Sequence, residues 1–174
     1  MVKVGPKDFV IDLGSGDGRM VITAAKKFGA RGFGVDLDTV LLKLSNENAQ
    51  REEVADRARF IEQNLFETDL SQATVITSYL LPEMNEKLRP KLLNLKPGTR
   101  IVSNSFTMGE WKADQTATVD KHCTSYCTAY FWIVPAKVEG TWQLPQGELR
   151  LKQDFQMISG TLKSASNSAP ITNG

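Results

Sequence analysis

Cysteine and histidine are scarce in this chain of 174 residues, which has two cysteines and one histidine. Cys123 and Cys127 stand four positions apart beside His122, and these three potential ligands fall short of the four that a structural zinc site needs. We therefore expect no metal. If the segment is a strand, the two thiols share one of its faces and are partly buried, and His122 has an ordinary structural role.

Long apolar runs and an excess of one charge are also missing. No segment approaches the roughly 18–20 apolar residues that span a bilayer, and Met1 to Lys7 lack the apolar run of a secretory signal. The 21 basic and 20 acidic residues give a formal net charge of +1, without a long run of either sign. We therefore expect a cytoplasmic protein that binds neither nucleic acid nor a membrane.

The composition is otherwise that of an ordinary globular protein. Hydrophobic residues make up 41% of the chain and charged residues 24%, both close to the averages of globular proteins. A chain of this length suits one domain. We expect a single domain over residues 1–162 and, because Ser, Asn and Pro dominate the end of the chain, a disordered tail over 163–174.

Apolar runs typical of strands alternate with helical patterns up to about Phe106. The expected strands are 9–13, 32–37, 59–63, 74–80 and 100–103. The expected helices are 20–28, 39–51 and 83–93, the last bent or restarted at Pro90. This alternation predicts an α/β fold with a parallel sheet covered on both faces. After Phe106 the sequence becomes aromatic and β-branched, which predicts antiparallel strands.

A glycine-rich loop, Gly14-Ser15-Gly16-Asp17-Gly18, follows the first expected strand. Glycines permit left-handed dihedrals and leave room for a ligand beside the backbone. A dinucleotide fingerprint would need glycine at position 19, which is Arg19. Asp12 and Asp17 would repel a pyrophosphate, but they can accept hydrogen bonds from an ammonium group. The alternative is a tight turn with a structural role only.

A second acidic position strengthens the interpretation as a cofactor site. Asp36 ends the second expected strand, twenty residues after Gly16, where Rossmann-type sites accept hydrogen bonds from both ribose hydroxyls. The alternative role for Asp36, a helix N-cap, suits Asp38 better. Leu37, directly after Asp36, and Ser78, in the fourth expected strand, are further candidate cofactor contacts.

A third cofactor contact is expected after the third strand. The amide oxygen of Asn64 can accept a hydrogen bond from an adenine amino group, and Leu65 can pack on the ring face. The alternative is that Asn64 is a turn residue.

These segments, together with Tyr79-Leu80-Leu81-Pro82 and the stretch 96–104, resemble class I S-adenosylmethionine-dependent methyltransferases over about 9–106. More narrowly, the chain is similar to small bacterial methyltransferases related to mitochondrial protein-lysine methyltransferases. The resemblance implies a Rossmann-like, doubly wound, seven-stranded sheet of order 3-2-1-4-5-7-6 with its last strand antiparallel, and extra C-terminal β-strands. It also implies S-adenosylmethionine as cofactor and S-adenosylhomocysteine as product.

The resemblance also assigns roles to individual residues. It places the first methyltransferase motif on Asp12, Gly14, Gly16 and Gly18. The acid that binds the ribose corresponds to Asp36, and Asn64 stands at the adenine position, where the family usually has aspartate. The family usually has one or two helices before the first strand, whereas only Met1 to Lys7 stand there. This departure implies an open site, or one covered by the C-terminal strands, another subunit or a segment absent from this chain.

The acceptor site is expected in the loop after the fourth strand, because doubly wound sheets bind ligands at the carboxyl ends of their strands. Tyr79 and Glu83 are the candidate catalytic residues: Tyr79 can orient an acceptor or attract its cation, and Glu83 can steer a cationic amine. The alternatives are a packing aromatic and a favourable charge in the first turn of a helix. Asn104, Ser105 and Trp111 are candidates for the opposite wall.

The identity of the acceptor stays open at this point. Methyl transfer from a sulfonium requires mainly alignment and exclusion of water, and an amine acceptor must also lose a proton. A protein lysine amine and a nitrogen, oxygen or sulfur atom of a small molecule are both compatible with these requirements. A non-catalytic module that binds S-adenosylmethionine is the alternative from another class, and a homo-oligomer can cover the open site.

Overall fold

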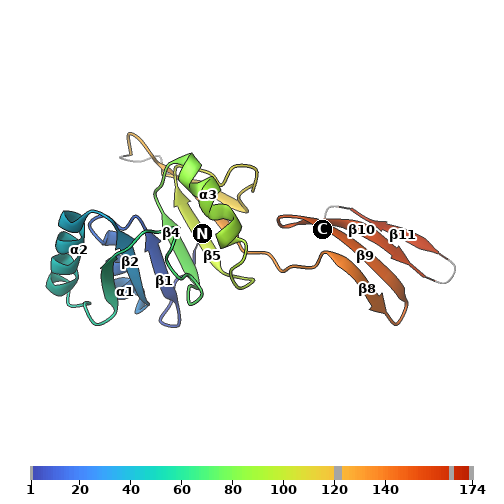
Figure 1. Cartoon of the computed structure of the whole chain (residues 1–174), viewed down its shortest axis with the longest axis horizontal. Helices are drawn as coiled ribbons and strands as arrows, with labels where there is room; N and C mark the ends of the chain where they lie inside the picture. The colour runs from blue at the N-terminus through green and yellow to red at the C-terminus, as the bar shows by residue number, and fades with distance from the viewer. Residues whose placement is uncertain (1, 120–122, 165–166, 173–174) are drawn as a thin grey trace.

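The structure is a computed structural model that describes residues 2–119, 123–164 and 167–172. Along the chain its elements are β1 (Phe9–Leu13), α1 (Arg19–Phe28), β2 (Arg31–Asp36), α2 (Thr39–Arg51), β3 (Ala58–Glu62), β4 (Val75–Ser78), α3 (Pro82–Leu92), β5 (Arg100–Asn104), β6 (Gln115–Thr118), β7 (Thr128–Ile133), β8 (Gly140–Leu144), β9 (Gly147–Asp154), β10 (Met157–Lys163) and β11 (Ser168–Ile171). They form two sheets, which stand apart in Figure 1.

The larger sheet has seven strands in the order β3-β2-β1-β4-β5-β7-β6. Strands β1 to β5 pair in parallel, whereas β7 runs antiparallel to both of its neighbours. This arrangement confirms the Rossmann-like, doubly wound sheet and its strand order. Strand 6 of that order is β6, for which the sequence predicted no residue range.

The side chains of β1 show why this sheet has helices on both faces. Val10 packs with Ala24 of α1, whereas Ile11 and Leu13 belong to a cluster on the other face that includes Leu88 of α3. Successive side chains of a strand point to opposite faces. A strand with apolar side chains on both faces therefore needs cover on both sides, as Val10, Ile11 and Leu13 predicted.

The helices begin and end largely where the local sequence indicates. Gly29 ends α1 in a left-handed conformation, and its N–H donates to the carbonyls of Ala24 and Ala25. Asp38 is the N-cap of α2, and its carboxylate accepts from the backbone N–H groups of Val40 and Leu41. The third helix does not restart at Pro90 and continues to Leu92, although Pro90 has no N–H to donate to the carbonyl of Glu86.

The smaller sheet is antiparallel, in the order β11-β10-β9-β8, and confirms the extra C-terminal β-strands. The structure differs from the disordered tail expected over 163–174, because Ser168 to Ile171 pair with β10. Backbone N–H and C=O groups along a sheet edge can bond a further strand whatever its side chains are, so a polar composition did not exclude pairing.

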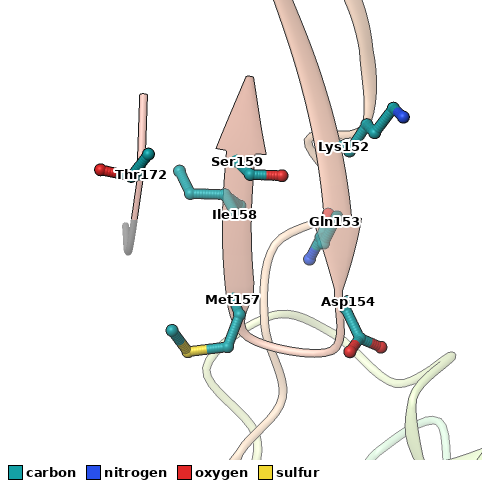
Figure 2. Close-up of a pocket in the computed structure, with 7 residues that line it drawn as sticks. All are labelled: Lys152, Gln153, Asp154, Met157, Ile158, Ser159 and Thr172. Carbon is teal, nitrogen blue, oxygen red and sulfur yellow. The ribbon is translucent and has the colours of Figure 1, made fainter. Parts of the chain in front are cut away.

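The strand register divides the smaller sheet into an apolar and a mainly polar face. The apolar face carries Trp142, Leu144, Leu149, Leu151, Ile158, Leu162, Ala169 and Ile171. Figure 2 draws Ile158 and Ser159, neighbours on β10, with their side chains extending in different directions. None of these apolar side chains belongs to a buried core cluster, and Figure 1 shows no helix beside this sheet among the described residues.

The tip of the β9–β10 hairpin connects the two sheets. The ring of Phe155 stacks on Trp111 with the centroids 6.2 Å apart, and the Arg89 guanidinium lies 5.6 Å from the Phe155 centroid. The side-chain amide of Gln156 donates to the carbonyl of Lys112 at 2.9 Å. The smaller sheet is therefore attached to the larger one through one aromatic contact and a few polar ones.

Cys123 and Cys127 form a disulfide, so the expectation of two partly buried free thiols was wrong. The reason is that the segment is an irregular loop before β7, not a strand, and the loop brings the two Cα atoms to 5.8 Å. His122 lies outside the described residues. In the part of the chain that the structure describes, no group of three potential metal ligands is found and no helix is long and apolar enough to cross a bilayer.

Candidate functional site

A cavity of about 750 Å³ lies at the carboxyl ends of β1, β4 and β5. Its polar lining is Asp12, Ser15, Asp17, Arg19, Thr77, Ser78, Tyr79 and Asn104, and its other lining residues are Gly14, Gly16, Met20, Leu41, Leu44, Val102 and Ala129. Most of the glycine loop, Ser78 and Tyr79 are thus brought together as predicted. The C-terminal strands β8 to β11 contribute no residue to the lining, so they do not cover this cavity.

The glycine loop is tightly packed behind and open in front. Gly14, Gly16 and Gly18 all have left-handed backbones, with φ of 75°, 52° and 81°. A Cβ atom at Gly18 would lie 2.5 Å from the Phe60 ring, whereas one at Gly16 would meet no protein atom within 4 Å. The space beside Gly16 is therefore available to a ligand.

The carboxylate of Asp36 ties the end of β2 to this loop. One oxygen accepts from the Gly16 N–H at 2.9 Å, and the other accepts from the Asp38 N–H at 3.1 Å. Asp36 is not in the cavity lining itself, but it lies directly behind Gly16. Because each carboxylate oxygen has two acceptor sites, both oxygens can still accept a hydroxyl.

Asp12 is a buried carboxyl group at the end of β1. The hydroxyl of Thr77 donates to it at 2.5 Å. Burial is the main cause that raises the pKa of Asp12 to about 7; the Thr77 hydrogen bond opposes the rise, and the nearby negative charges of Asp36 and Asp17 add to it. A cationic ligand in the cavity would offset this desolvation, so Asp12 suits an ammonium group.

The hydroxyls of Ser15 and Ser78 are buried and have no hydrogen-bond partner among the described residues. Both residues line the cavity. Both oxygens have almost no accessible surface, so they lie behind the cavity lining. Buried polar groups in proteins are nearly always hydrogen-bonded, and two unpaired ones beside one cavity mark it as a functional site. The lining also contains the apolar side chains of Met20, Leu41 and Leu44, from α1 and α2, which suit an adenosine ring system.

Asp17 is already engaged within the loop. Its carboxylate pairs with Arg19 through an Nη2–Oδ2 contact of 2.7 Å, and these hydrogen bonds lower the pKa of Asp17. The sequence interpretation used Arg19 only to exclude a dinucleotide and missed this pair. This ion pair could have been predicted, because an acidic and a basic residue stand two positions apart at the start of the expected helix.

Six of the predicted cofactor-binding and catalytic residues lie outside the cavity lining: Gly18, Asp36, Leu37, Asn64, Leu65 and Glu83. The amide oxygen of Asn64 accepts from the Phe66 N–H at 3.0 Å, which is the turn role that the sequence left open. Leu65 packs against the main core cluster, and Leu37 and Glu83 are exposed. Cofactor contacts by Leu37, Asn64 and Leu65 therefore stay predictions.

The apolar wall was the part of the cavity that sequence reasoning missed. Met20, Leu41 and Leu44 have the spacing of ordinary apolar helix positions, and only the sheet's packing turns them toward the cavity. In the other direction, Trp111 was predicted as an acceptor wall and is instead fully buried in the core, where Trp132 donates to its carbonyl. Asn104 does line the cavity, whereas Ser105 does not.

Tyr79 stands at this cavity within a cluster of three aromatic rings. It is 50% exposed, it stacks on Phe106 with the centroids 6.1 Å apart, and it meets Tyr126 edge to face at 5.6 Å. Phe106 and Tyr126 are also 6.1 Å apart. The sequence did not indicate that these three segments meet.

A second hollow lies on the smaller sheet and is drawn in Figure 2. Its lining residues, among them Lys152, Asp154, Met157 and Ser159, surround the β9–β10 hairpin. Unlike the cavity at the glycine loop, it contains no buried side-chain polar atom without a partner among the described residues. The geometry therefore favours the glycine loop as the functional site.

The strand order, the left-handed glycine loop, the acid after β2 and the buried Asp12 together define a class I S-adenosylmethionine-dependent methyltransferase. More narrowly, a family model described as the ANTKMT methyltransferase domain matches residues 12–115, and the chain belongs to that family.

Individual relatives agree with this assignment. A protein-lysine N-methyltransferase of Saccharolobus islandicus is 39% identical over 136 residues, which are 77% of this chain and 84% of the relative. A lysine N-methyltransferase of Caenorhabditis elegans, named for the C subunit of ATP synthase, is 32% identical over 62% of this chain, and the match spans only 58% of that relative.

Among solved structures, an RNA methyltransferase from Salinibacter ruber in complex with S-adenosyl-L-homocysteine is 46% identical, with a TM-score of 0.72 over 78% of this chain and 86% of the other. The chain is therefore an enzyme that transfers a methyl group, and S-adenosylmethionine is its cofactor.

Proposed function

We propose that this enzyme methylates the amine of a protein lysine. The observation that carries the proposal is the half-exposed Tyr79 at the cavity, beside the exposed Tyr126, because aromatic faces attract a cationic amine. The names of the relatives from Saccharolobus islandicus and Caenorhabditis elegans, both lysine N-methyltransferases, support it.

The residues of the cavity suit the parts of the cofactor. Asp12, Ser15 and Ser78 would lie at its amino-acid end, with Gly14 and Gly16 providing close backbone approach and Gly18 allowing the left-handed turn of the loop. Asp36 would accept from the ribose, and Asp17 would act through its backbone because Arg19 holds its carboxylate. Leu37, Asn64 and Leu65 stay proposed contacts of the adenine, where the Asn64 oxygen has a second lone pair.

When bound, the cofactor supplies an electrophilic methyl group on a sulfonium. The chain's task is then to hold the acceptor nitrogen in line with it, about 3–3.5 Å away, and to exclude water. Val102 of β5 and Ala129 of β7 are apolar lining residues outside the helices assigned to adenosine, and they lower the local polarity, which favours the neutral amine over the ammonium ion. Tyr79 would orient the amine, and the exposed Glu83 would attract its charged form before it enters.

An RNA acceptor is the main competing function, because the similar structure from Salinibacter ruber is described as an RNA methyltransferase. The lining argues against it: it contains two aspartates and one arginine, and that arginine is paired with Asp17. A polyanion needs unpaired basic groups along its path. A small molecule with a nucleophilic nitrogen, oxygen or sulfur is a further alternative.

The proposal includes two properties of the protein as a whole. We place it in the cytoplasm, where a disulfide such as Cys123–Cys127 would respond to the redox state. We also propose that copies of the chain associate and cover the site, since Met20, Leu44 and Tyr79 are apolar, line the cavity and are at least 40% exposed. Light scattering that finds only monomers with bound S-adenosylhomocysteine would contradict the association.

Methyl transfer from radiolabelled S-adenosylmethionine into a cell lysate tests the acceptor. We expect label that is removed by protease, resists ribonuclease and is recovered as methyllysine after hydrolysis, with much less label for Asp36→Ala at a limiting cofactor concentration. Label that ribonuclease removes would contradict the proposal and indicate RNA methylation. Label in the small-molecule fraction would contradict it and indicate a small-molecule acceptor. If no fraction is labelled although the cofactor binds, the chain is a binding module.

A further inference from the structure

The three rings of Tyr79, Phe106 and Tyr126 form an aromatic cluster outside the protein core. The loops after β4 and β5 and the loop before β7 each contribute one ring. Tyr79 is 50% exposed and Tyr126 is 59% exposed, whereas the core aromatics Trp111 and Trp132 are fully buried. Two rings of the cluster are thus exposed to water, although burial of aromatic rings stabilises a protein, and such exposed apolar surface indicates a binding site. The cluster adjoins the cofactor cavity, because Tyr79 belongs to the lining of that cavity.

The backbone around the cluster is held in an unusual conformation. Tyr126 and Ser105 both have left-handed dihedrals, with φ of 58° and 63°, although neither is glycine. The Ser105 N–H donates to the carbonyl of Thr128 at 2.6 Å. In the amide orientation that satisfies its surroundings, Asn104 donates to the carbonyl of Tyr126 at 3.0 Å. Such strain persists where the surrounding structure enforces it and is concentrated at functional sites.

The disulfide between Cys123 and Cys127 closes a short loop that contains Tyr126. Tyr126 directly precedes Cys127, so the crosslink restricts the backbone that carries its ring. A crosslink across a short loop removes alternative conformations of that loop. The disulfide and the Asn104 hydrogen bond therefore act on the same residue, and both favour the position in which Tyr126 meets Tyr79.

We infer that the aromatic cluster of Tyr79, Phe106 and Tyr126 is the binding site for an alkylammonium side chain of the acceptor, and that the Cys123–Cys127 disulfide holds Tyr126 in it. The inference rests on the proposed lysine methylation and specifies where the lysine binds. Ring faces attract the ammonium ion, and the ring surfaces pack against its methylene stem. The same negative faces do not attract a phosphate, and all three members of the cluster are uncharged.

The cluster divides the work at the acceptor between two environments. The exposed rings bind the amine while it is still charged and accessible to water, and the apolar lining at Val102 and Ala129 receives it as the neutral base. Neither Phe106 nor Tyr126 lines the cofactor cavity. Loss of either ring should therefore weaken acceptor binding, seen in KM, and leave cofactor affinity unchanged. Phe106 and Tyr126 are binding residues in this scheme, and the two cysteines are positioning residues.

Direct binding of small probes to the full chain with S-adenosylhomocysteine tests this inference without relying on turnover. The probes are N-acetyl-lysine methylamide and its uncharged analogue N-acetyl-norleucine methylamide, titrated by NMR. We expect the lysine probe to bind more tightly than the norleucine probe. Tyr126→Ala should weaken the lysine probe about 3- to 30-fold, and Tyr126→Phe should retain most of the binding because the ring remains. Trp142→Ala, an exposed aromatic of the smaller sheet, is the matched control and should change nothing.

The disulfide is tested in the same titration. Reduction with dithiothreitol, or the double variant Cys123→Ser and Cys127→Ser, should weaken the lysine probe as Tyr126→Ala does, and should have no further effect in the Tyr126→Ala background. Bound S-adenosylhomocysteine should keep its affinity throughout, which excludes unfolding as the cause.

Several outcomes would overturn the inference. Equal binding of the two probes, or full binding by Tyr126→Ala, would remove the cluster from acceptor recognition. Equal losses in Tyr126→Phe and Tyr126→Ala would assign the effect to the hydroxyl and not to the ring, and an unchanged titration after reduction would remove the disulfide from it. If the cluster binds the lysine probe but the lysate experiment yields no methyllysine, the proposed function fails and the binding site stands. If methyllysine forms while Tyr126→Ala binds normally, the reverse holds.

Discussion

The two sheets of this protein are built on different patterns of side chains. In the larger sheet β1 is apolar on both faces, with Ile11 completely buried on one side and Val10 nearly so on the other. In the smaller sheet β9 alternates, with Leu149 and Leu151 on the apolar face and Arg150 on the other. The first pattern requires helices on both faces, and the second requires cover on one face at most.

This difference explains where the function lies. The cavity with the buried Asp12 lies at the carboxyl ends of the strands of the larger sheet. The glycine loop and the strand ends supply most of its polar lining residues, and the helices α1 and α2 supply apolar ones. The smaller sheet has no helix on either face among the described residues, and the hollow of Figure 2 consists of side chains of the β9–β10 hairpin and Thr172. The cofactor site should therefore depend on the larger sheet and be largely insensitive to the smaller one.

The largest expected effect is on stability. Ile11→Ala should lower the free energy of unfolding by about 2–5 kcal/mol, because it leaves a cavity in the core of the larger sheet. Leu151→Ala should cost less than about 2 kcal/mol, because this side chain is only partly buried. Denaturant unfolding measures both, and equal losses would mean that the smaller sheet has its own complete core.

The next effect is on cofactor affinity. Asp36→Ala should weaken binding of S-adenosylhomocysteine by about 1.5–3 kcal/mol, because hydrogen bonds to a charged group are lost. The variant also removes the acceptor for the Gly16 N–H. Asp154→Ala in the smaller sheet is the control and should bind normally in the same calorimetric titration. An unchanged affinity of Asp36→Ala would refute the ribose assignment.

Binding of the cofactor should also depend on pH through Asp12. Its pKa of about 7 means that the carboxyl is mostly protonated at pH 6 and mostly ionised at pH 8, and the ionised form attracts an ammonium group. Affinity for S-adenosylmethionine should therefore rise by up to about tenfold over this range. Asp12→Asn should bind more weakly and show a smaller pH dependence. A decrease in wild-type affinity with rising pH would contradict the role of Asp12.

The same group should affect the stability of the cofactor-free chain in the opposite direction. Burial raises the pKa of Asp12 from its ordinary value of 3.8 to about 7, so between these values the folded chain binds more protons than the unfolded one. The contribution of Asp12 to stability is therefore fully present below about pH 4 and is lost as the pH rises through 7. Relative to Asp12→Asn, the wild type should lose stability over this window, as denaturant unfolding at several pH values would show.

The smallest effect is expected for the exposed aromatic of the smaller sheet. Trp142→Ala should change S-adenosylhomocysteine affinity by less than about 0.5 kcal/mol, because the side chain is 46% exposed and far along the chain from the cavity lining. A larger loss in calorimetry would show that the two sheets are coupled through the Phe155 contact.

Much of the cofactor half of the site could be predicted from sequence, because its signals are local. Left-handed turns need the glycines at 14, 16 and 18, and the N-cap of α2 needs a residue such as Asp38. Asp36 could be placed because a strand of known length ends in it. Asn64 shows the limit of this reasoning, since a free amide and a turn amide look the same in a sequence.

The acceptor half could not be predicted in the same way. The ring of Tyr79 meets rings that are 27 and 47 positions further along the chain. The contact depends on how β7 inserts beside β5 and on the loop that the disulfide closes. Trp111 failed as a wall residue for a related reason, because nothing in its neighbourhood reveals that it packs against Trp132 and Phe155.

By itself, then, the sequence determined the glycine loop from Asp12 to Gly18, the acid at Asp36 and the class of cofactor, while the strand order came from the resemblance that these residues carry. Dihedral preferences, caps and apolar periodicity act over a few residues and can be identified without a fold. The tertiary structure alone decided the apolar wall of the cavity, the disulfide and the aromatic cluster beside it. These depend on contacts between distant segments, which the packing of the sheet establishes.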